Sequence, residues 1–490
     1  MNVAVSAGGR RITTSAVLQL VSRLSGAAAG AVASAFLAHG LGRTDFGWFA
    51  STLAIVSLVN LAADLGLTQT VTRQIVINPG GERRIIEAAL LVRLSLAVFM
   101  LIFATWWAVH ADGAPKLSMA LLLAAVPISA LSVYQSVLLA RLRPDAIALG
   151  NIVQSLVWTG GCAVALFLNA SAVAFAAIFA GATLLQMALV ALFARRHLAD
   201  ADADADADAL PRVRIRTATS LLAASWLVGV GSLAWAAFNR GPLLIVVSLA
   251  GPDAAAALGA AARFVDAAYL LPTILASMLL PIATSRFRVG EELGSIIRAS
   301  IGWITIAGTL VVQFTAVLGE GIAAWLLGPG FSDLGLILTI CLAATIPFGW
   351  DCVWGTALIA AGRGSTMAWT GLVAVVISLG GSALFVREYG AIAAAVSILV
   401  AQATRALLLA VAQDGLAAVR FPYSGVIGLM VLTLVICWLG LDAVGPRETV
   451  ERVAIALTGA LGTLGMAKVA GLLPAGGVGR YLGKGTRIPS

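Results

Sequence analysis

Charged residues are scarce in this sequence. They make up 11% of its 490 residues, against roughly 25% in an ordinary soluble domain, whereas hydrophobic residues make up 60%. Because this number of charges is too small to cover a surface that faces water, most of the exterior has to face lipid. This excludes soluble enzymes and nucleic-acid-binding domains, and we expect no nucleic-acid partner. The net charge of +8 does not change that, because cytoplasmic loops of membrane proteins carry excess Lys and Arg.

Groups that carry out chemistry are also few. The four cysteines lie in apolar runs without CxxC spacing, which excludes a disulfide framework and a zinc site, and the three histidines form no catalytic set. No GxxxxGK[ST] motif is present, which excludes that route to ATP hydrolysis. The expected outer loops are too short to hold an acceptor, which disfavours a membrane glycosyltransferase or ligase. We therefore expect no catalytic residue, no metal site, no cofactor and no enzymatic activity.

Long apolar runs are abundant. Windows of about 20 hydrophobic residues, long enough to cross a bilayer as helices, recur fourteen times in groups of six, six and two. The expected spans are 13–38, 47–67, 85–109, 117–140, 147–168, 171–194, 218–249, 254–282, 296–327, 334–361, 364–386, 390–412, 422–441 and 450–472. This pattern predicts an all-α integral membrane protein with two six-helix lobes and two additional helices.

A run of Ala-Asp repeats, ADADADADADAL at 199–210, separates the first six spans from the next six. The run has no apolar periodicity with which to bury a core, and it lacks the Gly and Glu placement of an EF-hand loop. We interpret it as a solvated linker rather than a calcium site. The predicted domains are a lobe at 1–198, an Asp-rich cytoplasmic linker at 199–216, a second lobe at 217–413, and two helices with a basic cytoplasmic tail at 414–490.

Basic residues divide unevenly between alternate loops. With a cytoplasmic N-terminus, twenty of the 31 Lys and Arg residues fall on the cytoplasmic side, and six lie within spans. Five fall on the outer side, namely Arg43, Lys116, Arg387, Arg447 and Arg452. The positive-inside rule therefore predicts that both termini are cytoplasmic.

Ionisable residues within spans are candidates for a functional site, since each costs about 2.5–3.5 kcal/mol to insert at the bilayer centre. Those expected to bind substrate are Arg23, Arg93, Arg240, Arg263 and Arg405. Those expected to couple transport to protons or sodium are Asp64, Asp266 and Asp351. A cationic interior suits an anionic substrate such as a diphosphate, for which Arg offers paired donors. The alternative is that these charges are interhelical ion pairs, and the i, i+3 spacing of Arg263 and Asp266 fits it equally well.

Short motifs in the first 80 residues carry a family resemblance. The first reads Leu41-Gly42-Arg43-Thr44-Asp45-Phe46-Gly47, the second is the turn Asp64-Leu65-Gly66, and a looser echo occurs at Leu249-Ala250-Gly251-Pro252-Asp253. With these motifs and the six-plus-six-plus-two span count, the chain resembles the Wzx-type polysaccharide flippases of the multidrug/oligosaccharidyl-lipid/polysaccharide (MOP) exporter superfamily.

The resemblance implies a multi-pass flippase of the bacterial cytoplasmic membrane. Such a carrier moves an undecaprenyl-diphosphate-linked oligosaccharide repeat unit outward by alternating access, for biosynthesis of an O-antigen or exopolysaccharide. The implied partners are this lipid-linked substrate, membrane lipid, and a polysaccharide polymerase with co-assembly proteins.

Other functions stay open at this point. A lipid-linked peptidoglycan-precursor flippase shares the lobes, the lipid carrier and the cationic interior. A MATE-like small-molecule exporter is a further alternative, although an exporter of cations is expected to hold more acidic than basic groups in its interior. A non-transporting scaffold of a polysaccharide assembly complex would leave the buried arginines without a purpose.

Overall fold

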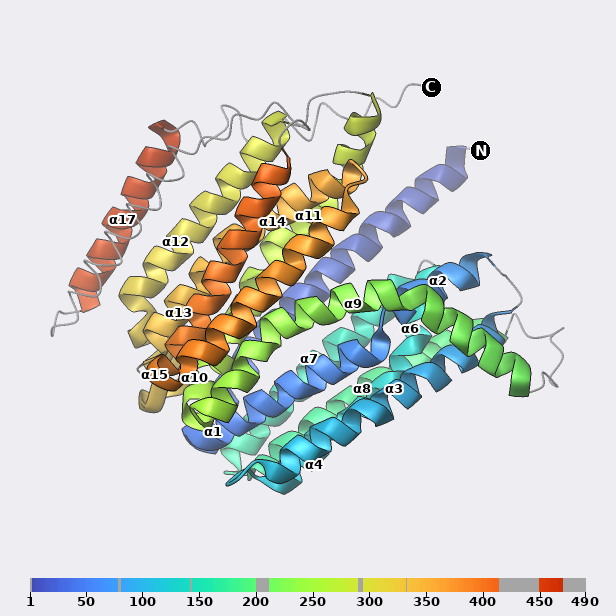
Figure 1. Cartoon of the computed structure of the whole chain (residues 1–490), viewed down its shortest axis with the longest axis horizontal. Helices are drawn as coiled ribbons and strands as arrows, with labels where there is room; N and C mark the ends of the chain where they lie inside the picture. The colour runs from blue at the N-terminus through green and yellow to red at the C-terminus, as the bar shows by residue number, and fades with distance from the viewer. Residues whose placement is uncertain are drawn as a thin grey trace. The chain divides into compact units, whose positions relative to one another are not determined.

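The computed structural model (Figure 1) describes residues 2–77, 81–141, 143–199, 211–289, 294–331, 333–413 and 449–469. Within these ranges every regular element is a helix. Ten helical segments of the described chain are long and apolar enough to cross a membrane. The prediction of an all-α, multi-pass membrane protein is therefore confirmed.

The first of two compact units comprises residues 1–259. Its helices, in chain order, are α1 (Asn2–Asp64), α2 (Leu67–Ile77), α3 (Glu82–His110), α4 (Lys116–Leu123), α5 (Ala125–Ser129), η1 (Ala130–Tyr134), α6 (Gln135–Ala140), α7 (Pro144–Phe167), α8 (Ala172–Ala199), α9 (Pro211–Leu249) and the start of α10 (Pro252–Ala268). The expected span 117–140 is present as α4, α5, η1 and α6, which follow one another without an intervening loop.

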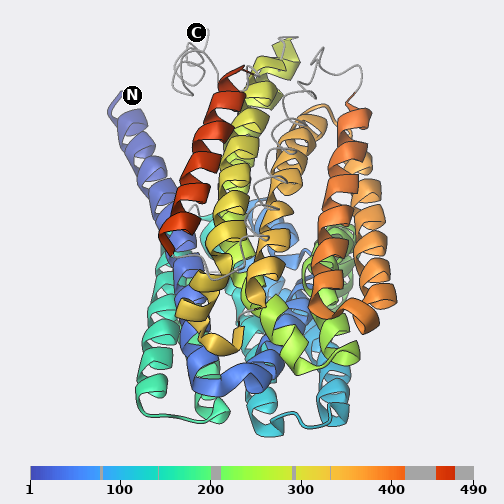
Figure 2. The ribbon, with the colours of Figure 1, turned by 90° about the vertical axis from the view of Figure 1, so that its left-hand side faces the viewer.

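The second compact unit comprises residues 260–490. After the end of α10, its described helices are α11 (Leu270–Val289), α12 (Gly294–Leu327), η2 (Pro329–Phe331), α13 (Leu334–Ala343), α14 (Thr345–Ala360), α15 (Gly364–Ala412) and α17 (Thr449–Val469). Figure 2 shows α17, in red, beside α12, in yellow, where Val317 packs against Ala456.

Two glycines explain why two very long helices each hold two expected spans. The backbone of α1 turns at Gly42 (φ 72°), and that of α15 turns at Gly390 (φ 57°). Such positive φ values are open to Gly at little steric cost. The expected spans 13–38 and 47–67 thus lie on either side of Gly42, and the spans 364–386 and 390–412 meet at Gly390.

The ten membrane-spanning segments carry twelve of the fourteen expected spans. The expected span at 450–472 overlaps α17, and the one at 422–441 lies outside the described residues. The count of fourteen therefore stays a prediction. The lobe boundaries also stay predictions, because most of the linker lies outside the described residues, although α9 begins at Pro211 within the expected linker 199–216.

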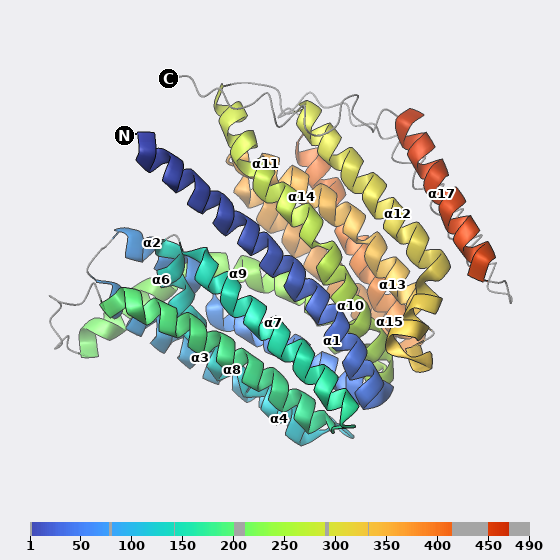
Figure 3. The same ribbon diagram turned by 180° about the vertical axis from the view of Figure 1, so that it is seen from behind.

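Close helix packing in the first unit depends on small residues. In Figure 3, α1 runs alongside α7, with which it is in contact, and α1 also contacts α9. A Cβ added at Gly47 of α1 would lie 1.9 Å from the carbonyl oxygen of Pro252, so only Gly fits there. Where lipid surrounds the helices, such close approach takes the place of the hydrophobic effect as the source of association.

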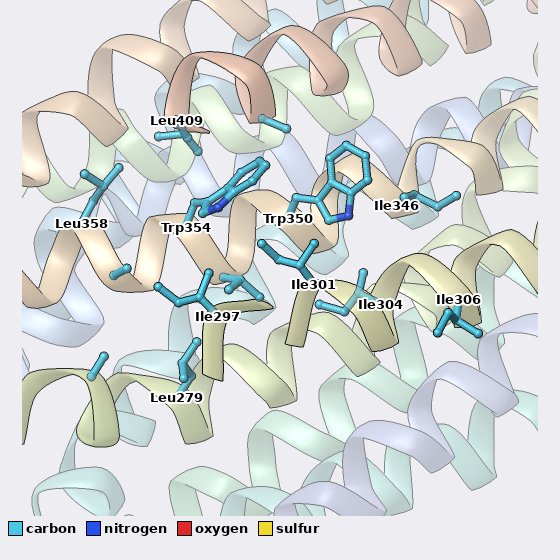
Figure 4. Close-up of a cluster of buried hydrophobic side chains, with 14 of the residues drawn as sticks. Leu279, Ile297, Ile301, Ile304, Ile306, Ile346, Trp350, Trp354, Leu358 and Leu409 are labelled. Carbon is cyan, nitrogen blue, oxygen red and sulfur yellow. The ribbon is translucent and has the colours of Figure 1, made fainter. Parts of the chain in front are cut away.

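The core of the second unit is large and apolar. Figure 4 shows Trp350 and Trp354 of α14 beside Ile297 and Ile301 of α12, in a cluster that extends to Leu409 of α15. The two indole rings meet edge to face with centroids 6.0 Å apart. This cluster surrounds part of the helix that carries Asp351, one of the predicted site residues.

Candidate functional site

The first unit contains an ion pair between two predicted site residues. Arg93 Nη1 donates to Asp64 Oδ1 at 2.5 Å, and Thr68 Oγ1 donates to the same carboxylate oxygen at 2.6 Å. The Arg93 side chain is 8% exposed and the Asp64 side chain 24%. The carboxylate therefore keeps some access to its surroundings, whereas the arginine is almost fully enclosed.

Local backbone geometry places these three side chains together. Helix α1 ends at Asp64 because Leu65 and Gly66 take positive φ values of 39° and 73°, so the predicted Asp-x-Gly turn is present. The chain then starts α2, which puts Thr68 one turn beyond the carboxylate. Arg93 lies eleven residues into α3, about 16 Å along that helix. An arginine at this depth cannot reach the interface easily, and pairing with Asp64 is its means of remaining charged.

A second ion pair of predicted residues lies in the second unit. Arg405 Nη1 of α15 lies 3.1 Å from Asp351 Oδ2 of α14, and Gln402 Nε2 donates to the same oxygen at 3.2 Å. The side chain of Asp351 is 5% exposed and that of Arg405 is 14% exposed. Three buried atoms of this cluster make no hydrogen bond with the described residues: Asp351 Oδ1, Gln402 Oε1 and Arg405 Nε.

The other predicted site residues lie on α1, α9 and α10. Arg23 is exposed on α1 and makes no hydrogen bond or ion pair with the part of the chain that the structure describes. Arg240 on α9 is half-buried, as are Arg263 and Asp266 on α10, and each of these three takes part in an interaction with other residues. Arg93 and Arg405 are thus the arginines whose partners are identified as predicted aspartates.

This pairing limits what the two buried arginines can do as they stand. A guanidinium that is held by a carboxylate is already neutralised, so it attracts a second anion weakly. Separation of the pair would free the N–H donors for a phosphate oxygen. The arrangement can therefore exchange one anionic partner of Arg93 or Arg405 for another.

Neutral amides form a further polar cluster that the charge-based prediction missed. Gln186 Nε2 of α8 donates to Asn151 Oδ1 of α7 at 2.5 Å, and Gln154 Nε2 of α7 lies 3.3 Å from Thr183 Oγ1 of α8. Their sequence signal is the spacing of polar residues on α7 at 151, 154, 155 and 159, which places them on one side of the helix. A search for formal charge passes over this pattern.

Two of the three motif segments that suggested the family, at 41–47 and 249–253, meet near the ends of their helices. Thr44 Oγ1 donates to Asp253 Oδ1 at 2.6 Å, and Arg43 Nε donates to the backbone oxygen of Asp253 at 3.0 Å. Together with the close approach of Gly47 to Pro252, these bonds fasten the turn after Gly42 to the start of α10. These two motifs thus hold the turn after Gly42 and the start of α10 together, whereas the third motif, at Asp64, belongs to the first ion pair.

Comparison with known proteins gives one family and several related folds. A family model described as "Polysaccharide biosynthesis protein" matches residues 12–287, more than half of the chain. Among solved structures, the lipid II flippase MurJ in an inward closed conformation superposes with a TM-score of 0.69 at 11% identity, covering 92% of this chain and 98% of that one.

Two transporters of the MATE family are also similar in fold. An inward-facing multidrug resistance MATE transporter of the MOP superfamily has a TM-score of 0.56 at 14% identity, with 82% of this chain and 96% of that chain covered. The eukaryotic MATE transporter AtDTX14 has a TM-score of 0.56 at 12% identity, with 83% and 95% covered. No curated protein sequence matches the chain. At these sequence identities the structural similarities show a shared fold only.

Proposed function

Because the chain belongs to the polysaccharide biosynthesis protein family, we propose that it is a flippase for an undecaprenyl-diphosphate-linked oligosaccharide. We place it in the bacterial cytoplasmic membrane, with both termini in the cytoplasm. The substrate would be a repeat unit of a surface polysaccharide, an O-antigen or exopolysaccharide, and a polysaccharide polymerase with co-assembly proteins would take it up outside. The observation that carries the proposal is the Arg93–Asp64–Thr68 cluster, an enclosed cation whose carboxylate partner stays partly accessible.

The cluster supplies a way to couple binding to a proton. When Asp64 takes up a proton, its carboxyl group loses the charge that holds Arg93, and the guanidinium becomes available to a diphosphate oxygen. When the proton leaves, Asp64 forms its ion pair with Arg93 again, and the anion is displaced. Alternating access requires such a change of partner, since a carrier has to bind its cargo on one side and release it on the other. The coupling ion in this proposal is a proton, with sodium as the alternative.

The remaining arginines extend the same chemistry. Arg23, which is exposed on α1, supplies a guanidinium that no carboxylate of the described residues neutralises. We propose that Arg23 meets the diphosphate first, and that Arg240 and Arg263 contact the diphosphate or acidic sugars. Arg405 is held by Asp351 in a nearly closed cluster, so its role as a substrate contact depends on opening that pair.

A second candidate is transport of a lipid-linked peptidoglycan precursor. The fold shared with the lipid II flippase over 92% of the chain favours it, and the chemistry of a lipid diphosphate is the same. A MATE-like small-molecule exporter is the third candidate, and the arginine-rich interior argues against a cationic drug as cargo.

Complementation tests these candidates. The chain is expressed in one strain that lacks its polysaccharide flippase and in another depleted of its lipid II flippase, and the lipid-linked intermediate that accumulates in each is measured. We expect the wild-type chain to clear the undecaprenyl-diphosphate-linked repeat unit in the first strain only. Rescue of the second strain alone would replace the proposed substrate with the peptidoglycan precursor.

Variants in the same assay test the site. Arg93→Met is expected to abolish clearance at normal protein levels, and Asp64→Asn is expected to reduce it strongly. Arg83→Met is the matched control, because Arg83 lies on the same helix with a side chain that is 64% exposed and paired with Glu87. Full clearance by Arg93→Met would contradict the proposed role of the cluster.

A further inference from the structure

Helix α7 has two chemically different sides. One side carries strongly exposed apolar residues, with Leu156 68%, Val164 59% and Phe167 86% exposed. The opposite side carries Asn151, Gln154, Ser155 and Thr159, all of which are half-buried. The apolar side suits lipid, so the polar side faces away from the lipid and towards the neighbouring helices of the same unit.

We use the term amide seam for the polar side of α7 and the two residues of α8 that contact it. Its members are Asn151, Gln154, Ser155, Thr159, Thr183 and Gln186. None of them carries a formal charge. The seam therefore cannot hold a diphosphate by ion pairing, and its chemistry is that of neutral hydrogen-bond donors and acceptors.

The hydrogen bonds within the seam leave part of its capacity unused. Asn151 uses its oxygen and Gln154 uses its nitrogen, each in one bond with α8. Asn151 Nδ2, Gln154 Oε1 and Gln186 Oε1 make no hydrogen bond with any described residue, yet they are not among the fully enclosed unbonded atoms. These atoms are thus not completely enclosed, although Gln186 as a residue is only 7% exposed, and they present one donor group and two acceptors.

A second glutamine in the chain shows what a purely structural amide looks like. Gln313 of α12 bonds Thr463 of α17 with both ends of its amide, since Nε2 donates to Thr463 Oγ1 at 2.8 Å and Oε1 accepts from it at 3.0 Å. Both residues are completely buried. An amide that only holds helices together is satisfied and enclosed in this way, because an unmade bond inside a membrane is costly. The amide seam is not fully satisfied, and its four α7 members are half-buried rather than completely buried.

Helix α1 adds a cation beside the seam. Thr159 Oγ1 donates to the backbone oxygen of Ala29 at 3.2 Å, and the Cα of Gly26 faces Ser155, whose Oγ would lie 3.7 Å from a Cβ at that position. Arg23 precedes Gly26 by three residues, so both lie on the same side of α1. The exposed residue Arg23 is therefore within about one helical turn, along α1, of the part that borders the seam.

We propose that the amide seam binds the sugar portion of the lipid-linked substrate, while Arg23 binds its diphosphate. This inference rests on the proposed flippase function and assigns parts of the substrate to parts of the site. Sugar hydroxyl and N-acetyl groups each combine hydrogen-bond donors and acceptors. A neutral amide also has both, whereas a carboxylate only accepts and a guanidinium only donates. In a lipid-linked sugar the first ring is joined directly to the diphosphate, so the regions that bind these two groups have to be neighbours. The seam and Arg23 are neighbours along α1.

Binding measurements with two lipids that differ only in the sugar test this assignment. The full-length protein in lipid nanodiscs is titrated with undecaprenyl diphosphate and, separately, with undecaprenyl-diphosphate-N-acetylglucosamine. We expect wild-type protein to bind the glycosylated lipid more tightly. In Asn151→Leu and Gln154→Met we expect that preference to fall by about tenfold, the effect of losing one or two hydrogen bonds, with little change for the lipid that lacks sugar.

Two matched variants separate the assignment from general effects on folding. Gln313→Met removes the structural amide and is expected to keep the preference for the glycosylated lipid. Arg23→Ala is expected to lower the affinity for both lipids by a similar factor. Ser155→Ala provides a milder change in the seam should the larger substitutions lower the yield of folded protein. Thermal unfolding of each variant verifies that the protein compared is folded.

The possible outcomes separate this inference from the proposed function. Equal affinity of wild-type protein for the two lipids, or equal weakening of both by the seam variants, overturns the sugar assignment and leaves the flippase proposal intact. Loss of the preference in Gln313→Met also overturns it. Absence of binding to either lipid by wild-type protein overturns the proposed function and this inference with it.

Discussion

The two compact units each contain an arginine–aspartate pair, and the pairs differ in how tightly the carboxylate is enclosed, while both arginines are mostly buried, at 8% and 14% exposed. Asp64, in the pair with Arg93, has a side chain that is 24% exposed, whereas Asp351, in the pair with Arg405, has a side chain that is 5% exposed. The first carboxylate has a hydroxyl group beside it and the second an amide. The same two charged groups are therefore placed in different surroundings.

The difference in enclosure indicates different duties. A partly accessible pair can exchange its partner, because water or a ligand can reach the carboxylate when the ion pair opens. A sealed pair is fixed, because opening it would leave a charge in an apolar environment at high cost. The sealed pair lies between α14 and α15, next to the Trp350 and Trp354 cluster, where it holds two helices of the second unit together. We infer that the first pair serves transport and the second serves structure.

Arg405→Met tests the sealed pair and should have the largest effect on stability. It leaves the Asp351 carboxylate buried without its cation, which costs about 3–5 kcal/mol in other buried pairs. The free energy of unfolding, measured by reversible denaturation in mixed detergent micelles, should fall by that amount. A loss below about 1 kcal/mol would show that Asp351 is not sealed as the structure has it.

Arg93→Met makes the corresponding change in the accessible pair and should cost less stability. Asp64 keeps its bond from Thr68 and its access to the surroundings, so we expect a loss of about 1–2 kcal/mol in the same measurement. Clearance of the lipid-linked intermediate should nevertheless be lost, since the pair is proposed to act in transport. Should Arg93→Met and Arg405→Met destabilise equally, the contrast between the units would be wrong.

Hydropathy placed Arg93 and Asp351 within spans, and the structure shows both residues buried in helices, but the sequence did not identify their partners. Arg93 and Asp351 were identified because hydropathy alone places them inside spans. Their partners lie 29 and 54 residues away on other helices, and such distances depend on how helices pack, which periodicity does not encode. The only pair that spacing suggested, Arg263 with Asp266, lies on one helix, where the register is known without tertiary structure.

The fold shows the same limit in another form. Hydropathy located the spans of α1 and α15 and separated each helix into two, although the backbone continues through turns at Gly42 and Gly390. Single residues decide such turns, and a window of about 20 residues averages over them. The amides of α7 were missed because the prediction selected residues with a formal charge inside spans. A neutral polar residue has no such charge and lowers the mean hydropathy only slightly.

Thr68→Val is a smaller test of the accessible pair. It removes the hydroxyl group that donates to Asp64 Oδ1 and keeps the shape of the side chain, so we expect a loss of about 1 kcal/mol in stability. Without this bond the carboxylate is held less firmly beside Arg93, so clearance of the lipid-linked intermediate should be slower than in wild type. Gln402→Leu is the counterpart in the sealed pair, and it should leave the rate of clearance unchanged.

The smallest change in stability is expected when both members of a pair are removed at once. Arg405→Met with Asp351→Leu takes away two buried charges together, and replacement of a buried ion pair by apolar residues of similar volume is often neutral or stabilising. Stability within about 1 kcal/mol of wild type, with clearance of the lipid-linked intermediate retained, is the expected result. Arg93→Met with Asp64→Leu should be equally well folded and yet inactive, because the groups removed are those proposed to exchange partners. If the Asp351 double variant lost transport while folding normally, the sealed pair would have to open during the cycle, and both units would then use the same device.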